Sequence, residues 1–187
     1  YLYMEQSVAS WHSSGLLQTL LQHKLVFIET RDTRETAAAL RNFQRACDAG
    51  RGAVFLCVAR GKVSEGVDFS HHYGRCVVVI GLPFQYTKSP MLLQRLQYMK
   101  ETHGINQADY LTFDAIRQAS QCAGRVIRSK SDYSVMVFAD SRYNFPSKQE
   151  KLPEWIRKNI SVDYSNLSTD VAVTLVRRFV REMAQPW

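Results

Sequence analysis

Two arginines on adjacent turns of an expected helix, Arg125 and Arg128, give the first chemical signal in the sequence. They belong to residues 121–128, where Gln121, Gly124, Arg125 and Arg128 recur at a spacing that places them on one helical face. Two guanidinium groups at this spacing repel each other, and each presents a rigid fork of donors that matches an oxygen anion. The arrangement therefore favours a polyanion such as phosphate. The alternative is a solvated basic face on an ordinary amphipathic helix.

Gly124 favours the phosphate interpretation. Glycine costs a helix about 1 kcal/mol relative to alanine, and it permits close approach of another backbone or a ligand. The opposite face carries residues suited to burial, namely Cys122, Ala123, Val126 and Ile127. The segment thus predicts a helix that packs on one side and presents cations on the other.

A second candidate segment, residues 59–69, directly follows the apolar run 53–58. It places two glycines, Gly61 and Gly66, among basic, hydroxyl and acidic side chains. In a parallel α/β sheet, ligands bind at loops that leave the carboxyl ends of strands, where glycine-rich backbone can offer N–H groups to phosphate or ribose. The second segment therefore indicates a ligand-binding loop.

The two segments together resemble motifs V and VI of the superfamily 2 helicases. Residues 60–69 with 71–75 resemble motif V, and residues 121–128 resemble motif VI, in the form found in the XPD-type iron-sulfur DNA helicases that serve in TFIIH. The likeness continues through residues 137–142, 151–156 and 183–186, so it covers essentially the whole chain. The chain is thus similar to the C-terminal, second RecA-like motor domain of that family.

The resemblance implies a role for the polar residues of motif VI. In helicases of this superfamily the nucleotide lies between two RecA-like domains, and the second domain supplies arginines across the cleft. Arg128 then corresponds to the arginine finger, which stabilises charge on the transferred phosphoryl group, with Arg125 beside it at the phosphates. Gln121 is expected to hydrogen-bond the phosphates or the attacking water. The alternative for Arg125 is an ion pair inside the domain.

Further residues of the two motifs are expected near the nucleotide, namely Gly66, Asp68, Glu65 and Gly124. A carboxylate at position 68 can hold the guanidinium groups of motif VI in place. Glu65 has the alternative of tying down Arg60 or Lys62.

The resemblance also supplies candidates for DNA and partner contacts. Hydroxyls and cations can position the backbone of a DNA strand, and aromatic rings can stack on unpaired bases. The candidates for these contacts are Arg60, Lys62, Ser64, Arg142 and Tyr86. Arg142 has the alternative of bracing motif VI. The family uses its carboxyl-terminal region to bind the TFIIH subunit with a von Willebrand A domain, and Arg181 and Arg178 are the candidates for that contact. Solvent exposure is the alternative for all these cations.

Two parts of a nucleotide-hydrolysing site are absent from the sequence. No Gly-x-x-x-x-Gly-Lys-Ser/Thr motif occurs, because Gly61-Lys62 has Leu56 at the first glycine position and Val63 at the hydroxyl position. No Asp-Glu pair is present to hold Mg²⁺. We therefore expect ATP and Mg²⁺ to bind only at a site completed by a first motor domain. The chain, which does not begin with Met, is expected to be inactive by itself.

The composition is that of one globular domain with a basic charge. A formal net charge of +7 over 187 residues favours polyanionic partners, without separating nucleic acid from acidic protein. No apolar run approaches the roughly 18 residues of a membrane span. The cysteines lack metal-ligand spacing and are expected to be small buried side chains: Cys47, Cys57, Cys76 and Cys122. No metal is predicted here, and the 4Fe-4S cluster of the family is expected only in the missing half.

Alternating strands and helices predict an α/β fold with a parallel β-sheet flanked by helices on both faces, and the resemblance implies its RecA-like form. The expected strands are residues 25–29, 53–58, 76–80 and 134–139. The expected helices are residues 3–22 with an interruption at 13–15, 33–49, 91–102 and 107–127. Residues 1–187 are expected to form one domain, with residues 152–187 as a C-terminal helical extension.

The extension is expected to follow an exposed loop at residues 142–151. A short helix at 152–158 has Pro153 at its start. Ser168, Thr169 and Asp170 can cap a last helix over 171–183, which Pro186 stops. Its apolar stripe comprises Val171, Leu175, Val176, Phe179 and Val180.

The resemblance as a whole implies the second motor domain of an ATP-dependent 5′–3′ DNA helicase. Such a protein acts in the nucleus, in nucleotide excision repair and transcription initiation, on single-stranded DNA. One alternative is a scaffold whose importance is to dock the regulatory subunit of TFIIH. Another is a nucleic-acid-binding module that is not coupled to nucleotide.

Overall fold

The computed structural model describes residues 1–160 and 162–184. Its helices and strands in chain order are α1 (Leu2–Ser13), α2 (Leu16–His23), β1 (Leu25–Ile28), α3 (Thr33–Asp48), β2 (Ala53–Leu56), α4 (Lys62–Gly66), β3 (Cys76–Ile80), α5 (Pro90–His103), α6 (Gln107–Ala123), β4 (Val135–Ala139), α7 (Pro146–Gln149), α8 (Glu154–Arg157) and α9 (Thr169–Met183). Short 3-10 helices are η1 (His71–Tyr73), η2 (Gly124–Val126), η3 (Ser141–Asn144) and η4 (Val162–Tyr164).

Local sequence signals explain several boundaries. Gly15, at a φ of 78°, separates α1 from α2, in agreement with the predicted interruption. Asp32 caps α3, since its carboxylate accepts hydrogen bonds from the backbone N–H groups of Arg34 (2.6 Å) and Glu35 (3.1 Å). Asn106 caps α6 in the same way through the backbone N–H of Ala108 (2.8 Å).

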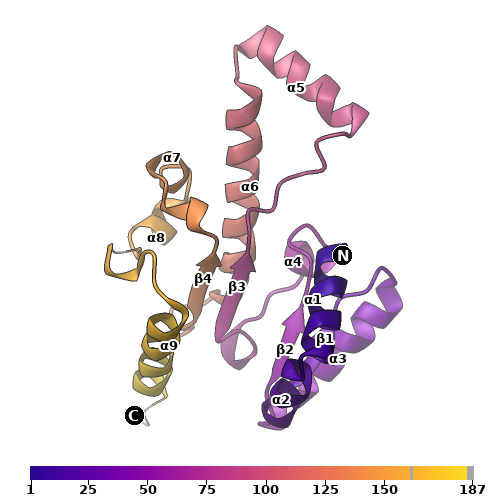
Figure 1. Cartoon of the computed structure of the whole chain (residues 1–187), viewed down its shortest axis with the longest axis vertical. Helices are drawn as coiled ribbons and strands as arrows, with labels where there is room; N and C mark the ends of the chain where they lie inside the picture. The colour runs from indigo at the N-terminus through magenta and orange to yellow at the C-terminus, as the bar shows by residue number, and fades with distance from the viewer. Residues whose placement is uncertain (161, 185–187) are drawn as a thin grey trace.

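The four strands form two parallel pairs. β1 pairs with β2 from Leu25 opposite Ala53, and β3 pairs with β4 from Cys76 opposite Val135. The predicted α/β class with parallel strands is confirmed. The expectation of one continuous sheet is wrong for the described residues, where no ladder of hydrogen bonds joins β2 to β3. Figure 1 shows β1 and β2 with α1, α2 and α3, whereas α7, α8 and α9 lie on the side of β4.

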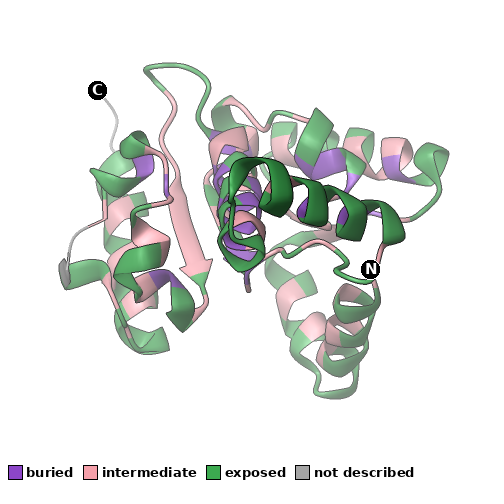
Figure 2. Ribbon diagram, turned by 90° about the horizontal axis from the view of Figure 1, so that it is seen from above, coloured by how far each residue is buried: buried purple, intermediate pink, exposed green. Residues whose placement is uncertain are grey.

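Each strand pair has its own apolar cluster. Beside β3 and β4 the buried residues are Val79, Leu82, Ile116, Ala119, Ala123, Tyr143, Leu152 and Ile156, which join α6 and α8 to the sheet. Beside β1 and β2 the ring of Phe43 from α3 stands edge-on to Phe27, Phe55 and Phe69, with centroids 5.6–6.3 Å apart. In Figure 2 the buried residues are purple, and the outer helices are mainly exposed. The two clusters fix α6 and residue 69, the elements that frame the candidate site.

One side of β3 is exposed, which corrects two expectations. Val78 and Ile80 are 51% and 60% exposed, and Cys76, which shares their side of the strand, is also exposed. The prediction of helices on both faces is therefore wrong at β3. The prediction of four buried cysteines is wrong for Cys76 and Cys57, whereas Cys47 and Cys122 are half-buried.

Three predicted segments have different boundaries. The helix expected over 107–127 ends at Ala123 and continues as the tighter turn η2, because the backbone N–H of Phe69 binds the carbonyl of Arg125 (2.8 Å). The segment 59–69 is not entirely a loop, since it contains α4. The segment expected to be an exposed loop at 142–151 contains η3 and α7, and Tyr143 within it is buried and donates a hydrogen bond to the carbonyl of Gly81 (3.1 Å).

The last helix, α9, begins at Thr169, two residues before the predicted start, and Ser168, one of the predicted capping residues, is its N-cap. The hydroxyl of Ser168 accepts a hydrogen bond from the backbone N–H of Val171 (3.4 Å). The predicted apolar stripe is only partly covered, because Val171 and Val180 are 47% and 39% exposed. Phe179 packs edge-on against Tyr133, with ring centroids 6.4 Å apart. Pro186, the expected stop, lies outside the described residues.

Candidate functional site

The carboxylate of Asp68 lies between the two arginines of residues 121–128. Its Oδ1 accepts a hydrogen bond from Arg125 Nη1 at 2.9 Å and a second from Arg128 Nη2. The side chains of Asp68 and Arg128 are 44% and 45% exposed, so the group is open to solvent. The hydrogen bonds from Arg128 and then Arg125 hold the pKa of Asp68 below its ordinary value. A single anion thus brings together the two cations that the sequence predicts to bind phosphate.

Arg125 also holds the carboxyl end of α4. Its Nε donates to the carbonyl of Ser64 (3.0 Å), and its Nη2 donates to the carbonyl of Glu65. The last carbonyls of a helix have no partner within the helix, so a cation at this end is favourable. Arg125 therefore joins motif VI to motif V through the side chain of Asp68 and the backbone carbonyls of Ser64 and Glu65. The predicted alternative for Arg125, an internal ion pair, is present in this structure.

Arg125 and Arg128 face a surface pocket of about 520 Å³. Its lining comprises Arg117, Ser120, Gln121, Gly124, Arg125, Ile127, Arg128, Pro153 and Trp155. All four polar or small residues predicted to share a helical face are in that lining. A methyl group at Gly124 would lie 3.6 Å from Trp155 Cζ2, an ordinary van der Waals distance. In this structure Gly124 therefore leaves the pocket wide and is not required for packing against the protein.

Asp132 fixes the backbone that carries Arg128. Its Oδ2 accepts hydrogen bonds from the backbone N–H groups of Arg128 and Ser129, each at 2.9 Å, and its Oδ1 accepts one from His71 (3.1 Å). The hydrogen bonds from Arg128 and Ser129 lower the pKa of Asp132 to about 2. Through Asp132, the backbone of motif VI at Arg128 is joined to the backbone at His71. The two motifs are therefore linked by backbone contacts as well as by side chains.

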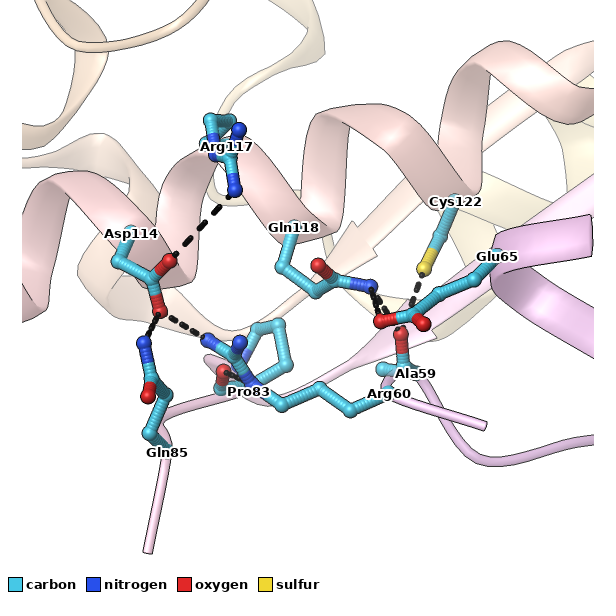
Figure 3. A network of polar contacts seen from close by, with 9 residues as sticks. All are labelled: Ala59, Arg60, Glu65, Pro83, Gln85, Asp114, Arg117, Gln118 and Cys122. Carbon is cyan, nitrogen blue, oxygen red and sulfur yellow. Dashed lines mark hydrogen bonds and ion pairs between the residues drawn. The ribbon is translucent and has the colours of Figure 1, made fainter. Parts of the chain in front are cut away.

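A second polar network joins α6 to the loop after β3, and Figure 3 shows it. Asp114, a buried residue of α6, accepts hydrogen bonds from Arg60 Nη2 and Gln85 Nε2, both at 2.5 Å. Arg60 Nε also donates to the carbonyl of Pro83 (2.9 Å), and Arg117 lies 3.9 Å from the other oxygen of Asp114. Arg60 is thus engaged by Asp114 and not by Glu65, the partner named in the sequence alternative.

The same figure shows how α6 contacts the start of motif V. Gln118 Nε2 donates to the carbonyl of Ala59 (2.5 Å) and reaches Glu65 Oε1 at 3.5 Å. Cys122 Sγ also lies 3.4 Å from the carbonyl of Ala59. Glu65 therefore contacts an amide of α6 instead of tying down Arg60 or Lys62.

The remaining motif V candidates for DNA contact differ in accessibility. Ser64 is buried, and its hydroxyl donates to the carbonyls of Val58 (2.8 Å) and Gly61 (3.0 Å). In this structure the hydroxyl is not available to a DNA strand, because it binds the turn that precedes α4. Lys62 is exposed and donates to Thr33 Oγ1.

Two further DNA candidates follow neighbouring strands. Tyr86 lies in the loop after β3 and is 74% exposed. Arg142 lies after β4, and its guanidinium binds both oxygens of Asp140, at 2.9 Å and 2.6 Å. Because β3 and β4 are parallel neighbours, both residues follow the same edge of the sheet. Asp140 is the partner of Arg142 here, and no described contact joins Arg142 to motif VI.

The candidates for partner contact lie on α9. Arg178 and Arg181 are exposed and line a second pocket of about 320 Å³, together with Thr174, Arg177 and Glu182. Arg178 forms an i,i+4 ion pair with Glu182 at 3.4 Å. This group is separate from the residues that line the first pocket.

Sequence reasoning missed three carboxylates that organise the site, Glu29, Asp114 and Asp132. None belongs to the motifs by which the site was found, and each acts mainly on backbone N–H groups or on neighbouring loops. A carboxylate directly after an apolar strand, as at Glu29, is a signal that could have been used. Within the described residues no three His, Cys, Asp or Glu side chains are grouped as a metal site, and no helix there is long and apolar enough to cross a bilayer.

The chain is similar to known helicase proteins over its whole length. The chain matches the family model described as "Helicase C-terminal domain" over residues 1–159. It is 56% identical over 187 residues to the "General transcription and DNA repair factor IIH helicase subunit XPD" of Arabidopsis thaliana, which covers 100% of this chain and 25% of that protein. The XPD/RAD3 subunit of Saccharomyces cerevisiae is 52% identical over 186 residues, with coverage of 100% and 24%.

A more distant relative is the "Regulator of telomere elongation helicase 1 homolog" of Drosophila mojavensis, 32% identical over 190 residues, or 99% of this chain and 19% of that protein. The chain therefore spans between 19% and 25% of the length of these relatives. The family model covers most of the chain, including both arginines and Asp68. On this evidence the chain belongs to the helicase C-terminal domain family.

Proposed function

We propose that this chain is the second RecA-like motor domain of an ATP-dependent 5′–3′ DNA helicase of the XPD type. The names of its Arabidopsis and yeast relatives support a nuclear role in TFIIH, in nucleotide excision repair and transcription initiation. In this proposal the chain supplies motifs V and VI to an ATP site that it shares with a first motor domain.

One observation carries the proposal. Arg125 and Arg128 converge on the single carboxylate of Asp68 at the edge of an open pocket. The pair between Arg128 and Asp68 is 45% and 44% exposed, and ion pairs this exposed contribute little to folding stability, so a purely structural role is a poor explanation for Arg128. Cations at an open pocket are well suited to a bound polyphosphate, which offers more oxygens than one carboxylate. Asp68 then keeps the guanidinium groups in position until the phosphates arrive.

The residues of the pocket have separate tasks in the proposed reaction. Arg128 stabilises the charge that develops on the transferred phosphoryl group, and Arg125 holds the phosphates while it fixes α4. Gln121 hydrogen-bonds the phosphates or the attacking water, and Gly124 lines the pocket beside them. Glu65 and Gly66 lie outside that lining, at the end of α4 that Arg125 holds, and we assign them to the nucleotide site through this contact. The described residues offer no carboxylate cluster that fits Mg²⁺, which shields phosphate charge in such reactions, so we assign that ion to residues outside this chain.

The test is Arg128→Ala in the full-length protein that contains this chain. An arginine finger contributes about 10³ to 10⁵ in rate, so we expect ATP hydrolysis and DNA unwinding to fall at least tenfold while the protein stays folded. The matched control is Arg41→Ala, which removes the same charge from an exposed position on α3. Rates equal to those of the control would rule out the finger assignment.

We place the DNA track on the edge of the sheet that follows β3 and β4. Tyr86 is the exposed aromatic candidate for stacking on a base, and Arg142 is the candidate for a phosphate contact. Arg60 and Lys62 contribute positive charge from motif V. Ser64 contributes to this track only indirectly, by shaping the turn that carries Arg60 and Lys62.

A second candidate function, a scaffold for protein assembly, is favoured by α9. Its outer surface combines exposed arginines with partly exposed apolar residues, which suits a protein partner more than solvent. We assign this surface to the TFIIH subunit with a von Willebrand A domain, with Arg181 and Arg178 as contacts. If the scaffold function dominates, Arg181→Ala abolishes partner binding and repair activity while Arg128→Ala leaves both intact. The motor function predicts loss of ATPase activity in Arg128→Ala with partner binding retained.

A further inference from the structure

Glu29 is a buried carboxylate that none of the motifs contains. It directly follows β1, and its residue is only 1% exposed. A buried carboxylate costs several kcal/mol unless its oxygens receive hydrogen bonds. Within the described chain no lysine, arginine or histidine forms an ion pair with it. Its stabilisation must therefore come largely from other donors.

Both oxygens of Glu29 accept hydrogen bonds from the backbone at the start of motif V. Oε2 accepts one from the N–H of Val58 at 2.9 Å, and Oε1 accepts one from the N–H of Val63 at 3.3 Å. Val58 lies two residues before Arg60, where the motif begins, and Val63 is in the first turn of α4. Glu29 thus spans the turn that connects β2 to α4. Two hydrogen bonds that one side chain accepts from N–H groups five residues apart restrain this turn.

Gly61 shows how closely the carboxylate fits this turn. A Cβ added at Gly61 would lie 2.8 Å from Glu29 Cδ and closer still to both carboxylate oxygens. A real Cβ essentially never approaches a non-bonded atom this closely, so the carboxylate occupies the space that a side chain at position 61 would need. The turn and Glu29 are therefore packed as one unit.

Helix α4 is consequently held at both ends. Glu29 binds a backbone N–H of its first turn, and Arg125 binds the carbonyls of Ser64 and Glu65 at its other end. Asp68 follows α4 by two residues and contacts Arg125 and Arg128. A shift of α4 would therefore move Asp68 relative to the guanidinium groups.

We propose that Glu29 is a positioning residue for the arginine pair. It fixes the amino end of α4, and through α4 it sets where Asp68 meets Arg125 and Arg128. The catalytic part of this inference rests on the proposed ATPase function. The geometric part does not, and it can be tested separately.

The geometric test is amide hydrogen exchange in the full-length protein. Glu29→Gln preserves size but replaces one acceptor oxygen with an NH₂ group that cannot accept from a backbone N–H. We expect the amides of Val58 and Val63 to exchange at least tenfold faster, and residues 64–68 to lose protection with them. The control is Glu35→Gln, the same change at an exposed residue of α3. Exchange at Val58 and Val63 equal to that of the control overturns the proposal.

A second pair of variants tests the fit at Gly61 without relying on Glu29→Gln to fold. Gly61→Ala should lower the melting temperature strongly in the wild-type background, because the methyl group displaces the carboxylate. In a Glu29→Ala background, Gly61→Ala should lower the melting temperature by at most half as much, because the carboxylate no longer fills the space. Equal losses in both backgrounds would show that Glu29 does not fill this space.

The catalytic test is a double-mutant cycle in ATP hydrolysis. If Glu29 acts through the arginine pair, Glu29→Gln lowers kcat at least fivefold, and Glu29→Gln with Arg128→Ala is no slower than Arg128→Ala alone. If the kcat of the double variant falls by the product of the two single effects, the two residues act independently and the coupling is overturned. If hydrogen exchange responds as expected but Arg128→Ala itself leaves kcat unchanged, the proposed function fails while the hold of Glu29 on α4 stands.

Discussion

At the scale of single residues, carboxylates that accept from backbone N–H groups determine where the arginines lie. Asp132 holds the backbone at Arg128 and His71, and Glu29 holds the turn before α4. The guanidinium groups themselves meet at Asp68. Asp68 and Asp132 thus contact the arginine segment directly and offset the repulsion between its two cations, and Glu29 acts on it, in our proposal, through α4.

The lowered pKa of Asp132 gives a prediction about acid stability. A carboxyl with a depressed pKa in the folded state stabilises the fold above its unfolded pKa of about 3.9, and this contribution disappears as pH falls through the folded value. With a folded pKa of about 2, Asp132→Asn should destabilise the domain at neutral pH. The difference from wild type should shrink between about pH 4 and pH 2.

Urea unfolding of residues 1–187 at a series of pH values measures this difference. Asp163→Asn, at an exposed aspartate of η4, is the control and should leave the curves close to wild type. A difference between Asp132→Asn and wild type that stays constant from pH 7 to pH 2 would contradict the assigned role of the carboxylate.

At the scale of elements, the sequence predicted what depends on local signals. The start of α3 follows from Asp32, the break before α2 from Gly15, and the start of α9 from Ser168. The end of α6 was predicted four residues too late, because the spacing of Arg125 and Arg128 suits a helix. The carbonyl of Arg125 instead binds the backbone of Phe69, a contact between distant segments that periodicity does not reveal.

For the candidate site, the sequence identified the main residues but not all of their contacts. Residue types and spacing pointed to Arg125 and Arg128 as phosphate ligands, with a solvated face as the alternative, and the resemblance to motif V added Asp68; the structure brings all three together. Spacing did not reveal that Ser64 faces inward or that Arg60 binds Asp114, since both depend on how α4 and α6 pack. The open side of β3 was also beyond prediction, because an apolar strand has the same sequence whether or not a helix covers it.

Packing between η2 and the turn at Gly74 gives a prediction at this scale. A Cβ at Gly74 would lie 2.7 Å from Val126 Cγ1 and would also collide with the carbonyl of Phe69. Gly74→Ala should therefore lower the unfolding free energy by about 1–3 kcal/mol, as overpacking does elsewhere. Thermal unfolding measures this loss, and Gly124→Ala is the contrast, since its methyl group would meet only Trp155 at 3.6 Å. Equal stability of the two variants would refute the steric argument.

The paired ends of β3 and β4 give a prediction about DNA. Arg142→Ala should weaken binding of oligo(dT) by the full-length protein and reduce the slope of log affinity against log salt by about 0.7, as expected for one lost phosphate contact. Tyr86→Ala should weaken binding by about 1–3 kcal/mol, the usual value of a stacked base, with the salt slope unchanged. Fluorescence anisotropy at several salt concentrations distinguishes the two effects. Identical salt slopes for Arg142→Ala and wild type would exclude the phosphate contact.

At the scale of the whole molecule, the proposed function makes the chain one side of a divided active centre. It carries cations at an open pocket, yet its sequence lacks both a phosphate-binding loop and an Asp-Glu pair. Purified residues 1–187 should therefore show no Mg²⁺-dependent ATP hydrolysis above a buffer blank in a phosphate-release assay. The full-length protein serves as the positive control. Turnover by the isolated chain that disappears in Arg128→Ala would contradict the division.

Helix α6 connects two regions of this molecule that the sequence presents separately. Asp114 binds Arg60 and Gln85 on one side, and nine residues later the helix ends beside Arg125, about 13 Å further along its axis at 1.5 Å per residue. A tilt of about 5° about Asp114 would displace the far end by roughly 1 Å, a misplacement that can cost an active site a hundredfold in rate. A contact at the loop that carries Tyr86 that tilted α6 would therefore misplace the arginine pair at the other end of the helix.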